Sequence, residues 1–245
     1  MRITEVEAVV LRQPALNDRI ADGSQDDLIV RVHTDEGIIG IGEVDSQPEV
    51  VKAVIEAPSS HAVAAGLRDV LVGEDPMDIK RLWRKMYRAV IYFGRRGPAI
   101  HAISGLEIAL WDIKGKALNK PVSALLGTPR RGRVRAYASV LMPATEDEVR
   151  ATVGNLIDQY GFTAVKLGWG PLGRDADHDV QLARAARQAG GDQVDILIDA
   201  GLGYGADVER ATRVALELEQ LGIFWLEEPF EPDELDPEVM AELAV

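Results

Sequence analysis

The sequence of 245 residues contains no cysteine. This absence excludes a disulfide framework, a thiolate nucleophile, a zinc–thiolate site and iron–sulfur ligation. Any metal ion that this chain binds must therefore be held by oxygen or imidazole ligands.

Long uncharged apolar segments are also absent. No such run approaches the roughly 18 residues of a membrane-spanning helix, so no membrane partner is expected. The first 14 residues alternate apolar and polar side chains, and Glu5 and Glu7 lie where a signal peptide needs an apolar core. This segment is therefore predicted to be a strand, and a cytoplasmic location is the default expectation.

Basic residues are in the minority, with 27 Lys and Arg against 40 Asp and Glu, a formal net charge of −13. Acidic balance without basic clusters argues against a protein that binds nucleic acid through phosphate charge. The hydrophobic share of 47% and the charged share of 27% are ordinary for a globular protein. The length allows one large domain or two unequal ones.

The first ~130 residues have an α+β pattern. Strands are predicted over residues 2–12, 28–34 and 38–44, and Asp35-Glu36-Gly37 forms a hairpin loop between the last two. Helices are predicted from Asp75-Pro76 onward and over residues 99–118, where apolar residues recur at spacings of three and four.

From Val134 onward strands and helices alternate. Strand-like runs begin at Val134, Thr163, Val194 and Ile223, at spacings of 29, 31 and 29 residues. Four parallel strands with right-handed crossovers form either an open doubly wound sheet or part of a closed barrel. The helices between them have recognisable ends, including a capping box predicted at Thr145.

Polar residues stand at or near the carboxyl ends of all four predicted strands: Ser139, Lys166, Asp199 and Glu227. This placement favours a (β/α)8 barrel, which builds its chemistry on that face. A complete barrel takes roughly 250 residues, whereas residues 134–245 supply 112. We therefore expect only about the first four βα units of a TIM-type barrel here, and expect the chain to be the N-terminal part of a longer protein.

Two carboxylates are the candidate metal ligands. Asp199 ends one predicted strand, and Glu227 ends the next, with Glu228 directly after it. At equal heights on adjacent strands, carboxylates repel each other unless a cation or a proton lies between them, and hard oxygen ligands suit Mg²⁺. The alternative is that these acids are helix N-caps at strand–helix junctions.

Lys166 lies inside an apolar strand and is a candidate catalytic residue. A lysine on a barrel strand can point toward the mouth and act as a base, an electrophile or a clamp for a carboxylate. Alternatively, Lys166 reaches the rim and pairs with Asp199. The glycine-rich loop from Trp169 to Asp175 is interpreted as a turn before a helix that Asp175 caps.

These residues together resemble a known family. The run from Ala102 to Leu118, continuing through Pro121 to Gly127, resembles the signature helix of the mandelate racemase/muconate lactonizing branch of the enolase superfamily. Asp199 and the motif Trp225-Leu-Glu-Glu-Pro229 resemble that family's metal-binding strand ends. The similarity covers essentially the whole chain.

The resemblance implies an α+β capping domain over residues 1–130 and the N-terminal half of a barrel domain over residues 131–245. It implies that Asp199 and Glu227 are two of three Mg²⁺ ligands, the third being expected beyond Val245. The family's reactions begin by abstracting the proton α to a carboxylate, and Mg²⁺ stabilises the resulting enediolate.

The sequence departs from the family pattern on the second barrel strand. Many members carry Lys-x-Lys there, and the second lysine is a base, whereas this chain has Lys166-Leu-Gly168. Lys166 therefore remains as a clamp for the substrate carboxylate, and two-base racemisation is in doubt. Similar acid-sugar dehydratases take a histidine–aspartate dyad from strands six and seven, a region not present here.

Two further residues are candidate substrate contacts. The segment from Pro14 to Asp27, which includes Arg19, resembles the family's specificity loop, and its polar character suits a hydroxylated ligand. Ser139 on the first barrel strand is placed to add a hydrogen bond to substrate; a buried, satisfied serine is the equal alternative.

The expected function is Mg²⁺-dependent dehydration of a sugar acid to a 2-keto-3-deoxy acid. A racemase or epimerase of the same superfamily is the alternative within enzymes. A third reading is a catalytically inactive, truncated member or an assembly module, because half a barrel leaves an open sheet edge. The expected partners are a small carboxylate substrate and further copies of the chain in a homo-oligomer.

Overall fold

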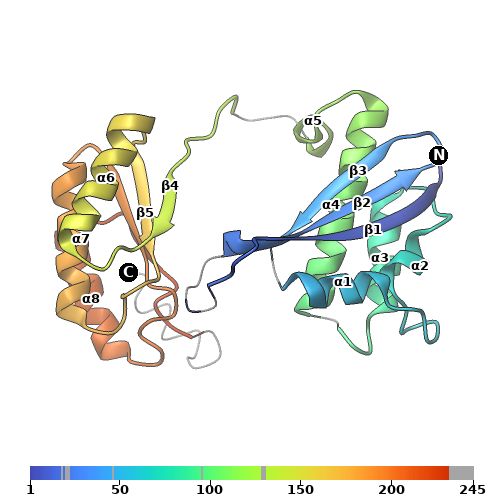
Figure 1. Ribbon diagram of the computed structural model, residues 1–245. Coiled ribbons are helices and arrows are strands. Elements are labelled where there is room, and N and C mark those ends of the chain that lie inside the picture. Colours follow the sequence, from blue (N-terminus) through green and yellow to red (C-terminus); the bar gives the residue numbers. More distant parts are fainter. Residues whose placement is uncertain (18, 20–22, 46, 95, 128–130, 232–245) are drawn as a thin grey trace. The chain divides into compact units, whose positions relative to one another are not determined.

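The computed structural model describes residues 1–17, 19, 23–45, 47–94, 96–127 and 131–231 (Figure 1). The chain divides into two compact units, Met1–Gly132 and Arg133–Val245. None of the helices in the described part is long and apolar enough to cross a membrane.

The first unit contains a three-stranded antiparallel sheet in the order β1-β2-β3. Its strands alternate buried and more exposed side chains, so one face lies on the core. The hairpin loop predicted at residues 35–37 is confirmed, and Gly37 has the positive φ of +77° that such a turn requires. The bounds are Ile3–Arg12 for β1, Asp26–Thr34 for β2 and Ile39–Val44 for β3, with a short 3-10 turn, η1, at Gly23–Gln25.

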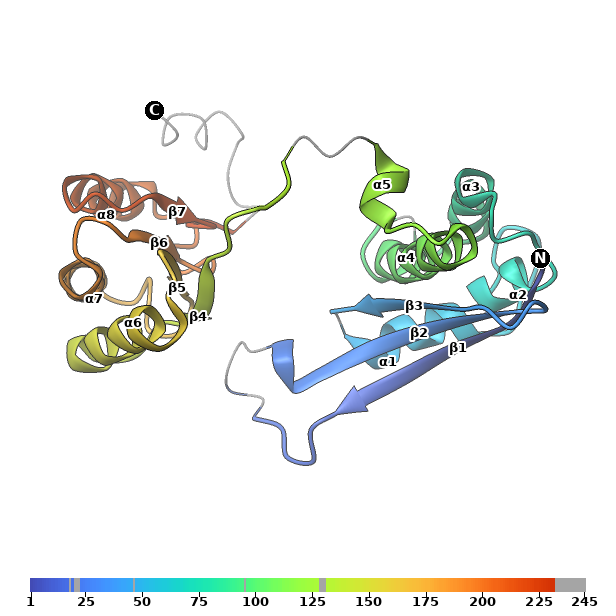
Figure 2. The ribbon, with the colours of Figure 1, turned by 90° about the horizontal axis from the view of Figure 1, so that it is seen from above.

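Helices cover the buried face of this sheet, and the longest, α4, runs beside the strands (Figure 2). Glycine permits a very close approach here. A Cβ on Gly40 would lie 2.1 Å from the carbonyl oxygen of Ala109, and one on Gly42 would lie 1.9 Å from that of Gly105. The five helices of this unit in the described chain are α1 (Pro48–Glu56), α2 (Leu67–Leu71), α3 (Ile79–Ala89), α4 (Pro98–Leu118) and α5 (Val122–Leu126).

Helix α3 begins later than predicted. Its N-cap is Asp78, whose side chain accepts a hydrogen bond from the Arg81 amide, and the helix starts at Ile79. Asp75 instead accepts from the Met77 amide in the preceding turn, 2.9 Å away. Asp75, which precedes Pro76, is therefore a turn residue, and Asp78 is the residue that caps the helix.

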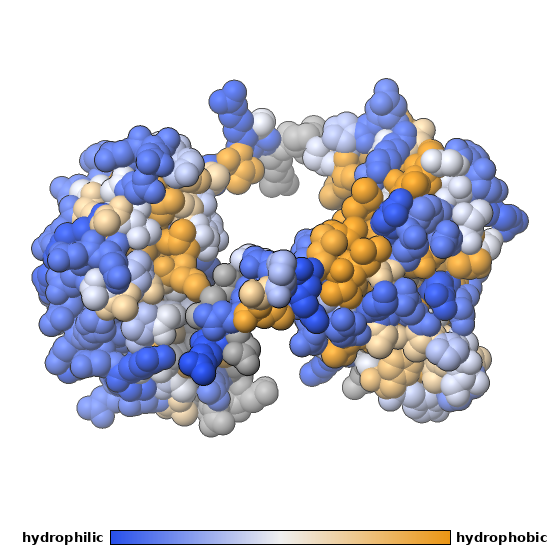
Figure 3. Space-filling view, viewed as in Figure 1, coloured by the Kyte–Doolittle hydropathy of each residue, from blue (hydrophilic) through white to orange (hydrophobic). Residues whose placement is uncertain are grey.

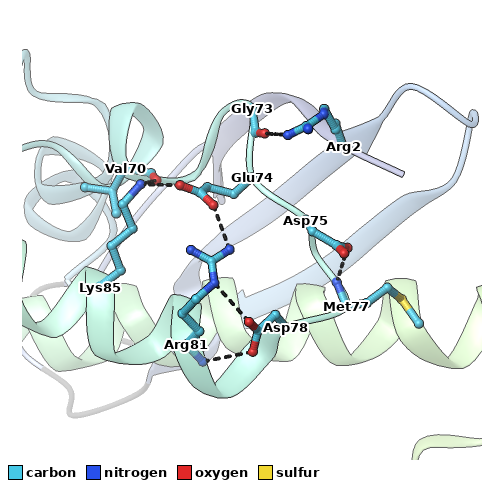
Figure 4. Close-up of polar contacts among 9 residues, drawn as sticks. All are labelled: Arg2, Val70, Gly73, Glu74, Asp75, Met77, Asp78, Arg81 and Lys85. Atoms are coloured by element: carbon cyan, nitrogen blue, oxygen red, sulfur yellow. Dashed lines mark hydrogen bonds and ion pairs between the residues drawn. The ribbon is translucent and has the colours of Figure 1, made fainter.

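Glu74 links α3 to the segment that follows α2 (Figure 4). Its two carboxylate oxygens accept from Lys85 at 2.5 Å and from Arg81 at 2.7 Å. Lys85 also donates to the carbonyl oxygen of Val70, at 2.8 Å. Hydrogen bonds from Lys85 and Arg81 hold the pKa of Glu74 below its usual range.

The second unit contains a four-stranded parallel sheet in the order β4-β5-β6-β7. Helices α6, α7 and α8 lie on one face of it (Figures 1 and 2). This is the arrangement predicted for the first four strands of a (β/α)8 barrel. The strands are β4 (Ala138–Leu141), β5 (Ala164–Gly168), β6 (Asp195–Asp199) and β7 (Trp225–Glu227), and the helices are α6 (Glu146–Tyr160), α7 (Ala176–Gly190) and α8 (Val208–Gln220).

The surface of this unit differs between its helices and its sheet. Figure 3 shows mostly hydrophilic side chains over α6, α7 and α8, whereas hydrophobic side chains gather beside β4 and β5. The helices bury their other sides against strand residues such as Val165, Leu167, Ile196 and Ile198. The sheet therefore has a dry face toward the helices and a second face that carries the polar side chains described below.

Strand bounds in this unit are shorter than predicted at two places. The first strand begins at Ala138 rather than Val134, and the Val134 side chain is 87% exposed. The last begins at Trp225 rather than Ile223. In the described chain neither Val134 nor Ile223 has a register partner on the neighbouring strand. The capping box of Thr145 and Glu148 at the start of α6 is confirmed.

Candidate metal and substrate site

Five residues of the second unit share one face of the parallel sheet. Asp199 is opposite Gly168 on one side and Glu227 on the other, and Lys166 is opposite Ser139. Because side chains alternate along a strand, positions 166 and 168 point to the same side as 199. The register therefore sets Asp199 and Glu227 at equal height on the adjacent strands β6 and β7. Lys166 lies on β5, two residues before the position that is level with them.

Lys166 joins the two carboxylates. Its Nζ donates to Asp199 Oδ2 and to Glu227 Oε1, at 2.9 Å in each case. The second oxygen of each carboxylate also has a donor: the Gly201 amide to Asp199 Oδ1 at 3.1 Å, and the Trp225 indole to Glu227 Oε2 at 3.1 Å. The repulsion expected between these acids is thus relieved by a cation placed between them.

This cluster is sheltered from solvent to different degrees. The Lys166 and Asp199 side chains are 13% and 7% exposed, and that of Glu227 is 34% exposed. Burial by itself lowers the pKa of Lys166, but the hydrogen bonds and charges of Glu227 and Asp199 outweigh burial and raise it above its usual value. The lysine is an ammonium ion in this arrangement.

For Asp199, the alternative role as a helix cap does not apply. The side chain of Asp175 caps α7, as predicted, and that of Asp207 caps α8. Asp199 lies at the end of its strand, several residues before α8. Lys166, in contrast, does form the pairing with Asp199 that was its alternative role, and it pairs with Glu227 as well.

Gly168 has a steric role that the sequence did not reveal. A Cβ at this position would lie 2.6 Å from Asp199 Cβ and 3.0 Å from its Cγ. The next residue, Trp169, has a φ of +59°, and its amide donates to the Asp199 carbonyl oxygen at 2.9 Å. The strand end leaves no room for the second lysine of a Lys-x-Lys pair while Asp199 keeps its position.

Two tryptophans that were not predicted as site residues lie beside the candidate site. Trp169 lies against Gly201, where a Cβ would be 2.5 Å from the indole ring. Trp225 donates to Glu227 as described above. Both follow or precede a site residue by one or two positions, and an aromatic residue with a polar tip next to a strand-end acid was the available signal.

The two predicted substrate contacts belong to different units of the chain. Ser139 is exposed and level with Lys166 on the neighbouring strand. Arg19 is exposed and belongs to the first unit, where its amide donates to the Asn17 side chain at 3.2 Å. Asp18 and residues 20–22 of the same predicted loop lie outside the described residues.

Asp199 and Glu227 supply the oxygen donors that Mg²⁺ prefers. Both already direct one oxygen at a single positive group, so the donor set fits a cation. Within the described ranges no three Asp, Glu or His residues lie together in a way that would hold a metal ion. Two protein ligands would leave the remaining positions to water and substrate, or to groups outside these ranges.

Each of the two units matches its own domain family. Residues 2–127 match the N-terminal domain of mandelate racemase/muconate lactonizing enzymes, and residues 148–245 match the enolase C-terminal domain-like family. The chain belongs to the mandelate racemase/muconate lactonizing enzyme family of the enolase superfamily. The α+β domain followed by part of a TIM-type barrel is thereby confirmed.

Relatives in this family act on sugar-derived acids and lactones. The chain is 33% identical to the D-galactarolactone cycloisomerase of Agrobacterium fabrum, covering 85% of this chain and 52% of that protein. It is also 33% identical to the arabinonate dehydratase of Saccharolobus solfataricus, covering 89% and 56%. The chain thus spans about half the length of the curated relatives that it matches.

A solved member of the family contains magnesium. The mandelate racemase/muconate lactonizing protein of Paracoccus denitrificans, crystallised with magnesium, matches with a TM-score of 0.82 and 30% identity. The match covers 99% of this chain and 62% of that one. The fold that positions Asp199 and Glu227 is therefore one in which a relative is seen with this ion.

Proposed function

We propose that this chain contributes a capping domain, residues 1–130, and half of a barrel domain, residues 131–245, to a Mg²⁺-dependent enzyme that abstracts the proton α to a carboxylate. The proposed reaction is dehydration of a sugar acid to a 2-keto-3-deoxy acid. The observation that carries the proposal is the convergence of Asp199 and Glu227 on one cationic position, at 2.9 Å from the Lys166 Nζ in both cases.

Asp199 and Glu227 would hold the metal ion. When bound, Mg²⁺ supplies positive charge beside the carboxylate that gains electron density as the α-proton leaves. Lys166 is the clamp for one substrate carboxylate oxygen, because it is the cation at the same strand ends. Ser139, level with Lys166 and exposed, is proposed to donate a hydrogen bond to a substrate hydroxyl, and Arg19 to contact substrate from the capping domain.

The choice of dehydration over racemisation is supported by Gly168. A racemase needs a base on each face of the substrate, and the crowding of position 168 by Asp199 leaves no lysine base there. The proton would then be removed by a group outside the described residues. The names of the relatives, arabinonate dehydratase and D-galactarolactone cycloisomerase, support a sugar acid as the substrate class.

Calorimetric titration of the chain with Mg²⁺ tests the ligand assignment. We expect binding that is weakened at least tenfold in Asp199→Asn and in Glu227→Gln. The matched control is Glu228→Gln, because Glu228 is exposed and adjacent and the substitution removes the same charge. Equal weakening in all three variants would show a general charge effect and would overturn the assignment.

The reaction is tested by screening sugar acids with Mg²⁺ present and assaying a 2-keto product with a carbonyl reagent. Dehydration releases such a product in proportion to the acid consumed. Exchange of the α-proton for solvent deuterium without a keto product would establish racemisation or epimerisation instead. Neither signal with any acid sugar would overturn both reactions for this chain.

A further inference from the structure

A buried carboxylate with no role so far lies beneath the loops of the site. Asp179 is in the first turn of α7 and is 2% exposed. Its Oδ2 accepts from the Gly173 amide and from the Tyr204 hydroxyl, each at 3.0 Å, and its Oδ1 is buried without a partner among the described groups. Burial raises the pKa of the Asp179 carboxyl, while the Gly173 amide and Tyr204 act in the opposite direction. Burying a carboxylate with one oxygen unpaired costs folding free energy, so a structural or functional role is expected for Asp179.

The two donors belong to different loops. Gly173 lies in the loop that follows β5, and Tyr204 lies in the loop that follows β6. The backbones of these loops are in contact, since a Cβ on Gly173 would lie 2.2 Å from the Gly203 carbonyl oxygen. Asp179 therefore fastens two neighbouring loops at the carboxyl ends of the parallel strands.

Tyr204 extends the connection to a third loop. Its ring is buried, 2% exposed, and the Arg210 guanidinium lies over it, 5.5 Å from the centroid. The Tyr204 amide donates to the Pro229 carbonyl oxygen at 3.1 Å, and the Leu202 amide donates to that of Glu228 at 2.8 Å. The loop after β6 is thus attached to the segment that follows Glu227.

The same loops carry the backbone around both proposed metal ligands. The Trp169 amide donates to the Asp199 carbonyl oxygen, and the Ala200 amide donates to the Glu227 carbonyl oxygen, each at 2.9 Å. We propose that Asp179 and Tyr204 are positioning residues that fix the loops after β5, β6 and β7 as one body and thereby set the spacing of Asp199 and Glu227. The effect of that spacing on metal binding rests on the proposed function, whereas the role of Asp179 and Tyr204 in holding the loops together does not.

Amide-resolved hydrogen exchange of the full chain tests the proposal. In Asp179→Ala and in Tyr204→Phe we expect the amides of Trp169 and Ala200 to exchange about tenfold faster, the change that follows loss of a buried hydrogen bond. Strand amides of β5 and β6 should stay protected. Asp179→Asn, which keeps an acceptor for both donors, should restore most of the protection.

Asp175→Ala is the matched control, because Asp175 caps the same helix and its side chain accepts from the amides of Asp177 and His178. It should loosen the start of α7 without affecting Ala200. Acceleration confined to Gly173 in Asp179→Ala and Tyr204→Phe would overturn the positioning role, as would a matching pattern in Asp175→Ala.

Mg²⁺ titration of the same variants separates this proposal from the proposed function. If the wild-type chain binds Mg²⁺, Asp179→Ala should bind it about tenfold more weakly. Faster exchange with unchanged Mg²⁺ affinity would overturn the effect on ligand spacing. If the wild-type chain takes no Mg²⁺ but exchange at Trp169 and Ala200 accelerates as expected, the positioning role stands and the ligand assignment fails.

Discussion

The Lys166 ammonium lies 2.9 Å from Asp199 Oδ2 and 2.9 Å from Glu227 Oε1, so one positive charge joins β5 to the carboxyl ends of β6 and β7. Each carboxylate keeps a second donor, so the three side chains hold one another in place. The same two oxygens are those that a metal ion would take. Lysine and metal are therefore expected to compete for one position, with consequences for stability.

Lys166→Met is expected to destabilise the chain by about 2 kcal/mol without Mg²⁺, because two partly buried carboxylates lose their shared cation. Mg²⁺ should then raise the melting temperature of this variant more than that of the wild type, since no ammonium has to be displaced. Thermal unfolding with and without Mg²⁺ checks this. Lys80→Met, at an exposed position, is the control, and equal Mg²⁺ effects in all three proteins would contradict the competition.

Gly168→Ala is expected to displace Asp199, because the new methyl group would lie 2.6 Å from Asp199 Cβ. Overpacking of this kind costs about 1–3 kcal/mol, and Mg²⁺ binding should weaken along with stability. Urea unfolding and calorimetry measure the two effects. Gly154→Ala in α6 is the control, since nothing lies within 4 Å of its Cβ position and alanine favours a helix. A stable Gly168→Ala chain with unchanged Mg²⁺ affinity would show that the strand end adapts freely.

Glu74→Gln tests the ionic link in the first unit. Because hydrogen bonds from Lys85 and Arg81 lower the pKa of Glu74 in the folded state, its contribution is fully present above the ordinary value of 4.5 and is lost as the pH falls through the lowered pKa. We expect the variant to be less stable than the wild type by about 1 kcal/mol at neutral pH. The difference should disappear in strong acid.

Urea unfolding of both proteins across this pH range provides the measurement. A difference that grows as the pH falls would have the wrong sign. In the background of Lys85→Met the effect of Glu74→Gln at neutral pH should shrink, because the partner with the shorter contact is gone.

Local sequence patterns determined the elements of this protein. The hairpin at Gly37, the capping box at Thr145 and the cap at Asp175 follow from side-chain chemistry within a few residues, and the structure contains all three. The 29- to 31-residue period determined the parallel βα order, because each repeat returns the chain to the same edge of the sheet. Asp199, Glu227 and Lys166 were proposed together from the sequence, because strand ends share one edge, and the structure brings their side chains into contact.

Only the tertiary structure decided which groups contact one another. Lys166 had two open roles until the register placed it below both Asp199 and Glu227. In the sequence, Gly168 was notable only because it stands where many relatives have a lysine. The structure shows that the Asp199 side chain occupies the space that a side chain at position 168 would need. Asp179 stands on the apolar stripe of α7, yet its partners come from loops 6 and 25 residues away. Such contacts depend on how strands and loops pack across the sheet, and that packing is a property of the whole fold that no local pattern encodes.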